Sequence, residues 1–378
     1  MKTEKPENIS ESVILETLSG NPSDFKVCAI GDKKRYDANR LLLGDNCRYE
    51  KDETIIKKEN TDVVVICGEY QPSNQIMSDN VPMIYLYQLI DYKAKKFWDS
   101  KKEYIGVDLN HHESNPYIVE YQKRYQKISI RDIISKYFNK NGKRKLKLLS
   151  IGCGCGASER EFLGTNFFSE IHGCDISPES LQIAKNKAEE IDKNRIITYF
   201  FYNANSDDLK DKYDIIFVHN CVHHIERLEF FYENVRKALK PNGIFIQNEY
   251  TGAPRFQHSG ISIKTVNLLL SLLPQRLKRK NTYQKIRMQD IILSDPSEAI
   301  RSDEIIPLTK KYFSKSKIWK FPCLIMHFLY QCVNADEFHT NKRRSLKLCS
   351  LVFNSERLLN YLGLVKPGGV LIVSEAKR

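Results

Sequence analysis

Three glycines, Gly152, Gly154 and Gly156, stand at every second position of a short segment that follows an apolar run. Glycines at this spacing let the backbone approach a ligand closely, because no Cβ is in the way. A helix that starts just beyond them would offer free N–H groups to an anionic group. A dinucleotide site wants its third glycine at the position of Ala157, which that fingerprint tolerates. The loop therefore predicts a ligand site without deciding the ligand.

Acidic and imidazole side chains end the apolar runs that come after the glycines. Asp175 lies about 20 residues beyond the loop, where a carboxylate can accept hydrogen bonds from both hydroxyls of a ribose. Histidines follow a later run, at His219 and again at His223 and His224, and Glu249 ends the next one. His223, His224 and Glu249 are our candidate general bases. The alternative is that the histidines pack against a ligand and that Glu249 makes a structural hydrogen bond.

The ten cysteines are scattered and indicate reduced thiols rather than a disulfide framework. Cys153 and Cys155 are separated by one residue, whereas zinc ligands are usually separated by two to four and need a second pair. We find no second pair and predict no metal. Beside the glycines, Cys153 and Cys155 are expected to act as small residues, with a nucleophilic thiol as the alternative.

The elements that must position these side chains alternate between strands and helices, which predicts an α/β fold with parallel sheets. In the second part of the chain we expect strands at 146–151, 170–174, 196–202, 213–218, 244–248 and 369–374, and a further strand near 317–320. Helices are expected from about Ser158, from Ser177 to about Asp192, and from Arg227 to Leu239. A long, mostly helical insertion should fill 251–313.

The first part of the chain repeats the pattern on a smaller scale. Strands are expected at 25–30, 62–67 and 81–87, with helices at about 36–43 and 53–60. We divide the chain into a module at 1–92, a helical connector or cap at 93–144, and a larger domain at 145–378. Two domains also agree with a length of 378 residues.

Composition excludes several classes of protein. The chain is 41% hydrophobic, so it can build ordinary cores, and no apolar run reaches the roughly 20 residues of a membrane span. The N-terminus is polar and lacks a signal peptide, so we expect a cytoplasmic protein. The net charge of +12 is compatible with nucleic acid, anionic lipid, phosphorylated substrates or a solvated surface.

The order of these motifs, together with Leu239-Lys-Pro-Asn-Gly243 before the expected strand at 244–248, resembles class I S-adenosylmethionine-dependent methyltransferases. The resemblance is close over about 145–250 and looser to the C-terminus. It implies a seven-stranded Rossmann-like sheet in which the C-terminal strand lies antiparallel between its neighbours. It also implies S-adenosylmethionine as the cofactor.

The resemblance assigns a role to each motif residue. The three glycines would line the methionine part and ribose of the cofactor, Asp175 would bind the ribose hydroxyls, and Ile176 would lie against the adenine. Asn203 falls where many members have an aspartate that binds the adenine amino group, so it departs from the family pattern. His219 and Asn220 would lie near the transferable methyl group.

The segment from Asn248 to His258, with the sequence Asn-Glu-Tyr-Thr-Gly-Ala-Pro-Arg-Phe-Gln-His, resembles a bacterial methyltransferase subgroup with Glu-Tyr-x-Gly-x-x-Arg-Phe-Gln after strand five. Such proteins are presumed to act in glycan or natural-product pathways. Tyr250, Arg255 and His258 are our candidate substrate-binding residues.

The N-terminal module resembles a truncated Gfo/Idh/MocA-type Rossmann domain over 25–32, 52–58 and 61–70. The first strand and glycine loop of such a domain are absent, so the module lacks the pyrophosphate-binding loop. We expect an incomplete Rossmann-like module that serves as an interaction or scaffold element, or a cap that merely shares its strand order. A protein partner could bind it.

The leading expectation is methyl transfer to a small molecule or a glycan precursor. The densest basic run, Arg276 to Lys280, falls in the insertion and suggests an anionic acceptor or carrier. One alternative is a nucleic-acid methyltransferase or RNA-binding protein, although no RNA-binding module is present. Another is a non-catalytic, cofactor-binding scaffold in a biosynthetic complex.

Overall fold

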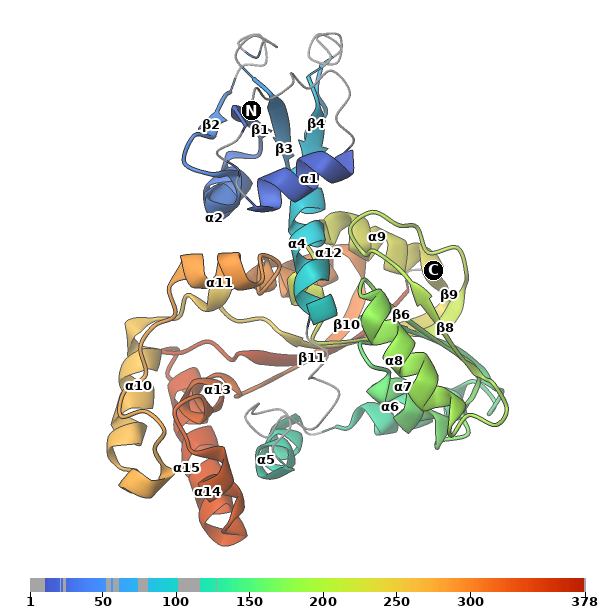
Figure 1. Cartoon of the computed structure of the whole chain (residues 1–378). Coiled ribbons are helices and arrows are strands. Elements are labelled where there is room, and N and C mark those ends of the chain that lie inside the picture. Colours follow the sequence, from blue (N-terminus) through green and yellow to red (C-terminus); the bar gives the residue numbers. More distant parts are fainter. Residues whose placement is uncertain are drawn as a thin grey trace. The chain divides into compact units, whose positions relative to one another are not determined.

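The computed structural model describes residues 11–20, 22, 25–51, 56, 61–73, 81–100, 116–126 and 128–376. These residues form two compact units (Figure 1). The first unit comes from 1–100 together with Arg287–Glu298, and the second from 101–286 and 299–378. The boundary expected at 92/93 falls within a helix, α4, that runs over Leu86–Ser100.

The first unit contains a parallel sheet of four strands in the order β2-β1-β3-β4. Its strands and helices are α1 (Glu11–Gly20), β1 (Val27–Gly31), α2 (Lys33–Leu43), β2 (Arg48–Tyr49), β3 (Val63–Cys67), β4 (Met83–Tyr85), α4 and α11 (Met288–Ser294). The apolar runs expected as strands near 25–30 and 62–67 are β1 and β3. The helix expected at 53–60 falls outside the described residues, apart from Ile56. The sheet is parallel as expected, while the resemblance to Gfo/Idh/MocA-type domains stays a prediction.

The second unit contains a sheet of seven strands in the order β10-β11-β9-β8-β5-β6-β7. Its strands are β5 (Leu146–Ile151), β6 (Phe168–Asp175), β7 (Ile197–Phe201), β8 (Tyr213–His219), β9 (Leu239–Tyr250), β10 (Lys315–Phe321) and β11 (Gly369–Glu375). Only β11 is antiparallel, and it lies between β9 and β10. The predicted fold class and the antiparallel position of the last strand are both confirmed.

The turn expected before strand five is a wide bulge within β9. Leu239 pairs with Tyr213, and Ile244 pairs with Ile215. The segment of β9 between these pairs is therefore longer than the segment of β8 that it faces. Asn242, inside the bulge, has φ of 63°, a left-handed conformation that asparagine tolerates better than most residues.

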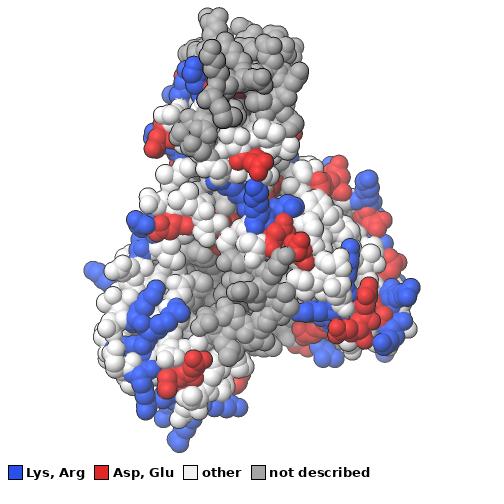
Figure 2. Space-filling view, viewed as in Figure 1, with Lys and Arg blue, Asp and Glu red and all other residues white. Residues whose placement is uncertain are grey.

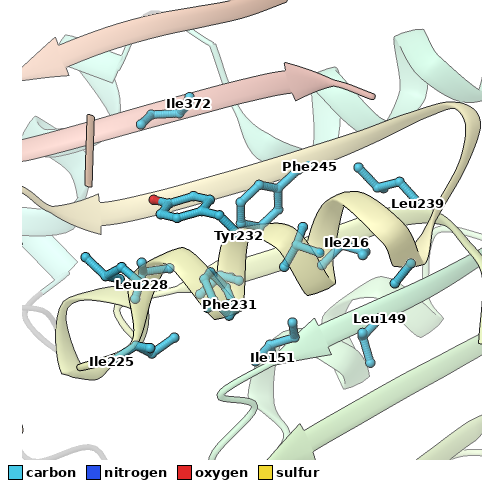
Figure 3. Packing of buried hydrophobic residues seen from close by; sticks show 14 of the residues in the cluster. Leu149, Ile151, Ile216, Ile225, Leu228, Phe231, Tyr232, Leu239, Phe245 and Ile372 are labelled. Carbon is cyan, nitrogen blue, oxygen red and sulfur yellow. The ribbon is translucent and has the colours of Figure 1, made fainter. Parts of the chain in front are cut away.

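Helices cover both faces of the sheet because successive strand residues point to opposite sides. Leu149 and Ile151 belong to the core beneath α9 (Leu228–Ala238) and α12 (Ile305–Tyr312), whereas Leu146 and Leu148 belong to the core beneath α6 (Ile130–Lys140) and α7 (Ala157–Leu163). Figure 3 shows the first of these cores, with the aromatic rings of α9 packed on β8 and β9. The remaining helix of this part is α8 (Pro178–Glu189).

The other helices of the second unit form a separate bundle. Its members are α5 (Pro116–Gln126), α10 (Gly260–Ser271), α13 (Leu324–Tyr330), α14 (Ala335–His339) and α15 (Lys342–Tyr361), with short 3₁₀ turns η5 (Val222–His224), η6 (Pro254–Phe256), η7 (Gln275–Leu277) and η8 (Ser302–Glu304) elsewhere in the unit. The bundle packs against Tyr250 and Phe256, just beyond the carboxyl end of β9. The insertion at 251–313 thus accounts for α10, while α13 to α15 form a second helical insertion between β10 and β11.

Candidate functional site

The glycine loop links β5 to α7 through three left-handed residues. Gly152, Gly154 and Gly156 have φ of 68°, 50° and 76°, a conformation that other residues adopt only with strain. A Cβ on Gly152 would lie 2.3 Å from the sulfur of Cys221, and one on Gly156 would lie 2.3 Å from the hydroxyl of Tyr199. A Cβ on Gly154 would meet nothing within 4 Å. The middle glycine therefore faces open space in which a ligand can approach the backbone.

Asp175, the last residue of β6, is tied to this loop. Its carboxylate accepts hydrogen bonds from the N–H groups of Gly154 and Ser177, both at 2.9 Å. Burial raises the pKa of Asp175, although these two N–H groups act to lower it. Two carboxylate oxygens offer about four acceptor positions, so the side chain can still accept bonds from two hydroxyls. Ile176 follows it and is half-buried.

Asn203 lies in the turn after β7 and its side chain is engaged locally. Its side-chain oxygen accepts a hydrogen bond from the N–H of Asn205 at 2.9 Å, while its own N–H donates to Asp207 at 2.8 Å. The residue that departs from the family pattern thus shapes this turn through an Asx-type contact.

The carboxyl ends of β8 and β9 bring another group of the expected residues together. His219 is exposed, and its Nε2 lies 3.5 Å from the side-chain amide nitrogen of Asn248. Asn220 donates its N–H to the carbonyl of Asn248 at 2.9 Å and has φ of 50°. This local pairing turns the chain sharply from β8 toward η5.

His223 and Glu249 form a buried pair. Glu249 Oε2 lies 2.8 Å from Nδ1 of His223, and Oε1 accepts the N–H groups of Cys221 and Val222, both at 2.7 Å. Burial alone would raise the pKa of Glu249, but the hydrogen bond from His223 and the two N–H groups hold that pKa below its usual value. An ionised carboxylate only accepts hydrogen bonds, so Nδ1 of His223 carries the proton.

His224 lies next to this pair, with its ring centroid 4.3 Å from that of His223. It is half-buried, and its N–H donates to the carbonyl of Cys221 at 3.0 Å. The three candidate bases therefore lie together, and a side-chain hydrogen bond joins His223 to Glu249.

Two of the candidate substrate residues contact each other. The hydroxyl of Tyr250 donates to the carbonyl of Ala253 at 2.9 Å and lies 3.2 Å from Nε2 of His258. Burial lowers the pKa of His258 to about 4, with a smaller contribution from the charge of Lys285. His258 is therefore neutral at pH 7 and suited to hydrogen bonding rather than to binding an anion.

Arg255 is buried in η6, with φ of 52°, and its N–H donates to the carbonyl of Ala299 at 2.9 Å. Phe256 beside it has φ of 50°. Two consecutive left-handed residues other than glycine are a strained arrangement, which structures keep mainly at functional sites.

Sequence reasoning missed two residues of this region. Cys221 packs directly against Gly152, and burial raises its pKa well above the usual value, so it stays a thiol. Glu159, in the first turn of α7, is fully buried, and burial raises its pKa to about 7. A buried carboxylate beside the glycine loop has no distinguishing spacing in the sequence, because acidic residues are common in first helical turns. The thiols of Cys153 and Cys155 also have raised pKa values because of burial, which argues against a nucleophilic role.

Comparison with known proteins matches residues 149–245 to the family described as "Methyltransferase domain". The chain is 30% identical to a ubiquinone biosynthesis O-methyltransferase of Pelagibacter ubique, over 40% of this chain and 58% of that protein. It is 31% identical to a non-reducing polyketide synthase of Emericella nidulans, over 30% of this chain but only 5% of the synthase. The chain thus spans less than two thirds of the length of the first of these relatives and only a small part of the second.

A solved methyltransferase from Mesorhizobium loti superposes with a TM-score of 0.38 at 16% identity, covering 61% of this chain and 91% of that one.

Proposed function

Since residues 149–245 carry a class I S-adenosylmethionine-dependent methyltransferase domain, we propose that the protein transfers a methyl group from S-adenosylmethionine to a small-molecule or glycan-precursor acceptor. The observation that carries the proposal is the bond between Gly154 and Asp175, beneath the open space that faces Gly154. This bond joins the backbone of the glycine loop to the carboxylate best placed for ribose hydroxyls. It lies at the carboxyl edge of the sheet, where ligands bind in such folds.

The residues present fit the cofactor. The three glycines would lie along its methionine part and ribose, Asp175 would accept from the ribose hydroxyls, and Ile176 would pack on the adenine. Asn203, His219 and Asn220 are the further proposed contacts. When bound, the cofactor supplies a methyl group on a positively charged sulfur, ready for in-line displacement. The protein's contribution is to align the acceptor with that group and to exclude water.

His223 is the base we propose for an acceptor that must lose a proton. Glu249 accepts the Nδ1 proton of His223, which leaves Nε2 as the proton acceptor. His224 is the neighbouring candidate, and Tyr250, Arg255 and His258 are the proposed acceptor-binding residues. For a carbon or neutral nitrogen nucleophile that needs no deprotonation, the same pair would orient the acceptor instead.

The proposed acceptor is a small molecule because the curated relatives include a ubiquinone biosynthesis O-methyltransferase and a demethylmenaquinone methyltransferase. An anionic group on the acceptor or its carrier is supported by the exposed Arg276, Arg279 and Lys280. Neutralising these residues together with Lys278 should raise the KM for such an acceptor, and an unchanged KM would reject the anionic group.

The absence of paired cysteines among the ten supports a cytoplasmic location.

Titration calorimetry with S-adenosylmethionine and its demethylated product tests the proposed function. The wild-type protein should bind both, and Asp175→Ala should abolish or greatly weaken binding. Asp211→Ala, which removes an exposed aspartate from the same unit, is the matched control and should bind normally. Failure of the folded wild-type protein to bind either ligand would reject the proposal. Binding without methyl transfer to any acceptor would favour a cofactor-binding scaffold.

A further inference from the structure

The outer face of α10 exposes an apolar stripe to solvent. Ile261, Leu268 and Leu272 are 41%, 62% and 66% exposed. At about 100° per residue these three positions fall within a sector of about 40° on a helix. The opposite face, with Val266 and Leu270, is buried in the helical bundle. The exposed leucines are therefore aligned rather than scattered.

The row is the apolar part of a mixed outer face. Lys264 is the only charged residue within α10, and Thr265 and Ser271 are the polar residues beside the exposed aliphatic side chains. Single exposed leucines are ordinary on a protein surface, but an aligned row marks a contact site. The row therefore calls for a partner that accepts aliphatic side chains.

The charge that follows the row identifies the kind of partner. Arg276, Arg279 and Lys280 are exposed and Lys278 is half-buried, and all four follow α10 directly. No acidic residue occurs between Glu249 and Asp290. Figure 2 shows the surface over α10 and its neighbouring helices, at the lower left, as mainly white and blue with little red. The partner must accept aliphatic side chains and positive charge together.

We propose that this α10 face, made of Ile261, Leu268 and Leu272 with the basic run Arg276–Lys280, docks onto an anionic phospholipid bilayer. A helix of 12 residues is about 18 Å long and can lie flat in the headgroup region. Its leucines then reach the acyl boundary while arginine and lysine pair with lipid phosphates, as in interfacial amphipathic helices. None of the described helices has the length and apolarity that crossing a bilayer requires, so the contact is peripheral. The basic run is the one proposed above to favour an anionic acceptor. Vesicle binding is measured without any acceptor, so failure of this inference and failure of the proposed methyl transfer are distinguishable.

Cosedimentation of the full chain with vesicles tests the proposal. The wild-type protein should bind vesicles containing phosphatidylglycerol and stay unbound with pure phosphatidylcholine. Each Lys or Arg near an anionic bilayer strengthens binding about fivefold, so Arg276→Gln with Lys280→Gln should weaken it about 25-fold. Leu268→Gln with Leu272→Gln should weaken it about tenfold, since these side chains lose their place in the acyl boundary.

Matched substitutions outside the face provide the controls. Leu293→Gln removes another leucine that is 63% exposed, and Lys310→Gln with Lys317→Gln removes two exposed charges elsewhere. Each should bind vesicles like the wild type, and circular dichroism should show all variants folded. Equal binding to neutral and anionic vesicles, or none to either, overturns the proposal. Vesicle binding that survives loss of the leucines also overturns it, because a purely electrostatic site would equally bind a soluble polyanion such as heparin.

Discussion

At the scale of single side chains, the contact of His223 with Glu249 decides which ring nitrogen carries the proton. Glu249 is held in place by two backbone N–H groups from η5, so the strand and the turn fix its orientation together. A neutral imidazole has one donor and one acceptor nitrogen, and an ionised partner at Nδ1 makes Nε2 the acceptor. The position of the proton thus follows from the backbone around Glu249.

Glu249→Gln tests this arrangement. If the amide nitrogen faces His223, it donates to Nδ1, and the ring proton moves to Nε2, where it blocks proton acceptance. For a hydroxyl acceptor we expect kcat to fall by about 10²–10⁴, the range for loss of a general base, with the affinity for S-adenosylmethionine little changed. His223→Asn should behave alike, whereas His339→Asn, in α14, should retain activity. Unchanged kcat in both variants of the pair would remove His223 as the base.

The glycine loop allows a comparison between neighbouring glycines. Gly152→Ala would place a methyl group 2.3 Å from the sulfur of Cys221, so we expect a loss of stability of about 1–3 kcal/mol from overpacking, besides the backbone strain. Gly154→Ala meets nothing within 4 Å and should cost only the left-handed strain of about 1–2 kcal/mol. It should nevertheless weaken cofactor binding, because its methyl group fills the open space. Urea unfolding and calorimetry measure the two effects, and normal cofactor affinity of Gly154→Ala would contradict the proposed site.

Glu159 should make stability depend on pH. Its carboxylate is fully buried, and burial raises its pKa to about 7, although the hydroxyl of Ser150 acts to lower that pKa. Between about pH 4.5 and 7 the folded chain keeps this proton and the unfolded chain loses it. The free energy of unfolding should therefore fall as pH rises through this window, by up to about 1.4 kcal/mol per pH unit, and level off above it. Burial also raises the pKa of Glu356 to about 7, so that residue adds a slope of its own. Glu159→Gln should therefore reduce the total slope in urea unfolding series without abolishing it, and an identical slope in both proteins would contradict the assignment.

The sequence predicted those site residues that stand at a characteristic spacing from one another. Gly154 and Asp175 belong to a loop and to the end of the next strand, and adjacent parallel strands bring those two places together. The contact of Cys221 with Gly152 depends on how η5 folds back over the loop. That contact depends on the tertiary structure, so no local sequence pattern predicts it.

At the scale of elements, α13 begins on a buried carboxylate from another helix. Glu356 of α15 accepts the N–H groups of Cys323, Leu324 and Ile325 at 3.0, 3.0 and 2.8 Å. These are donors that the first turn of a helix leaves without an intrahelical acceptor. The contact fixes α15 against the start of α13 within the helical bundle.

Glu356→Ala should destabilise the protein by about 3 kcal/mol or more, because it leaves three N–H groups, two of them buried, without an acceptor. Glu356→Gln keeps one acceptor oxygen and should lose less. Arg357→Ala changes the adjacent exposed residue and should stay within about 0.5 kcal/mol of the wild type. Chemical unfolding compares the three variants, and equal stability of Glu356→Ala and Arg357→Ala would show that the contact contributes nothing.

Elements with a strong local pattern were predicted within a few residues of their observed bounds. β3 and β5 are short apolar runs between turns, and α8 begins with a serine cap and a proline in its first turn. The helices α13 to α15 were not predicted as an insertion. Their apolar residues serve the bundle rather than the sheet, so the run at 321–333 has neither the alternation of a strand nor the spacing of a surface helix.

At the scale of the whole molecule, the chain forms two units, and the first of them contains two segments that are separated in the sequence. Residues 287–298 leave the second unit, pack with the first, and return, so α11 lies against α2 although they are far apart in the sequence. Every proposed cofactor residue belongs to the second unit. The domains predicted from the strand and helix pattern are contiguous in the sequence, whereas packing groups residues by contact. The segment around α11 could therefore not be assigned to the first unit from the sequence.

Cofactor-linked protection should follow the units rather than chain order. A ligand that binds only the folded state stabilises it by about 2.7 kcal/mol at a hundred times its Kd. With the demethylated cofactor product at that concentration, hydrogen exchange should slow in β5, β6 and β8, because the proposed cofactor-binding residues lie at the ends of these strands. In the wild type, hydrogen exchange in β1 and β3 should stay unchanged. In Asp175→Ala, the cofactor product should leave exchange unchanged in every strand. Slowed exchange in β1 or β3 of the wild type would instead place part of the cofactor's binding energy in the first unit.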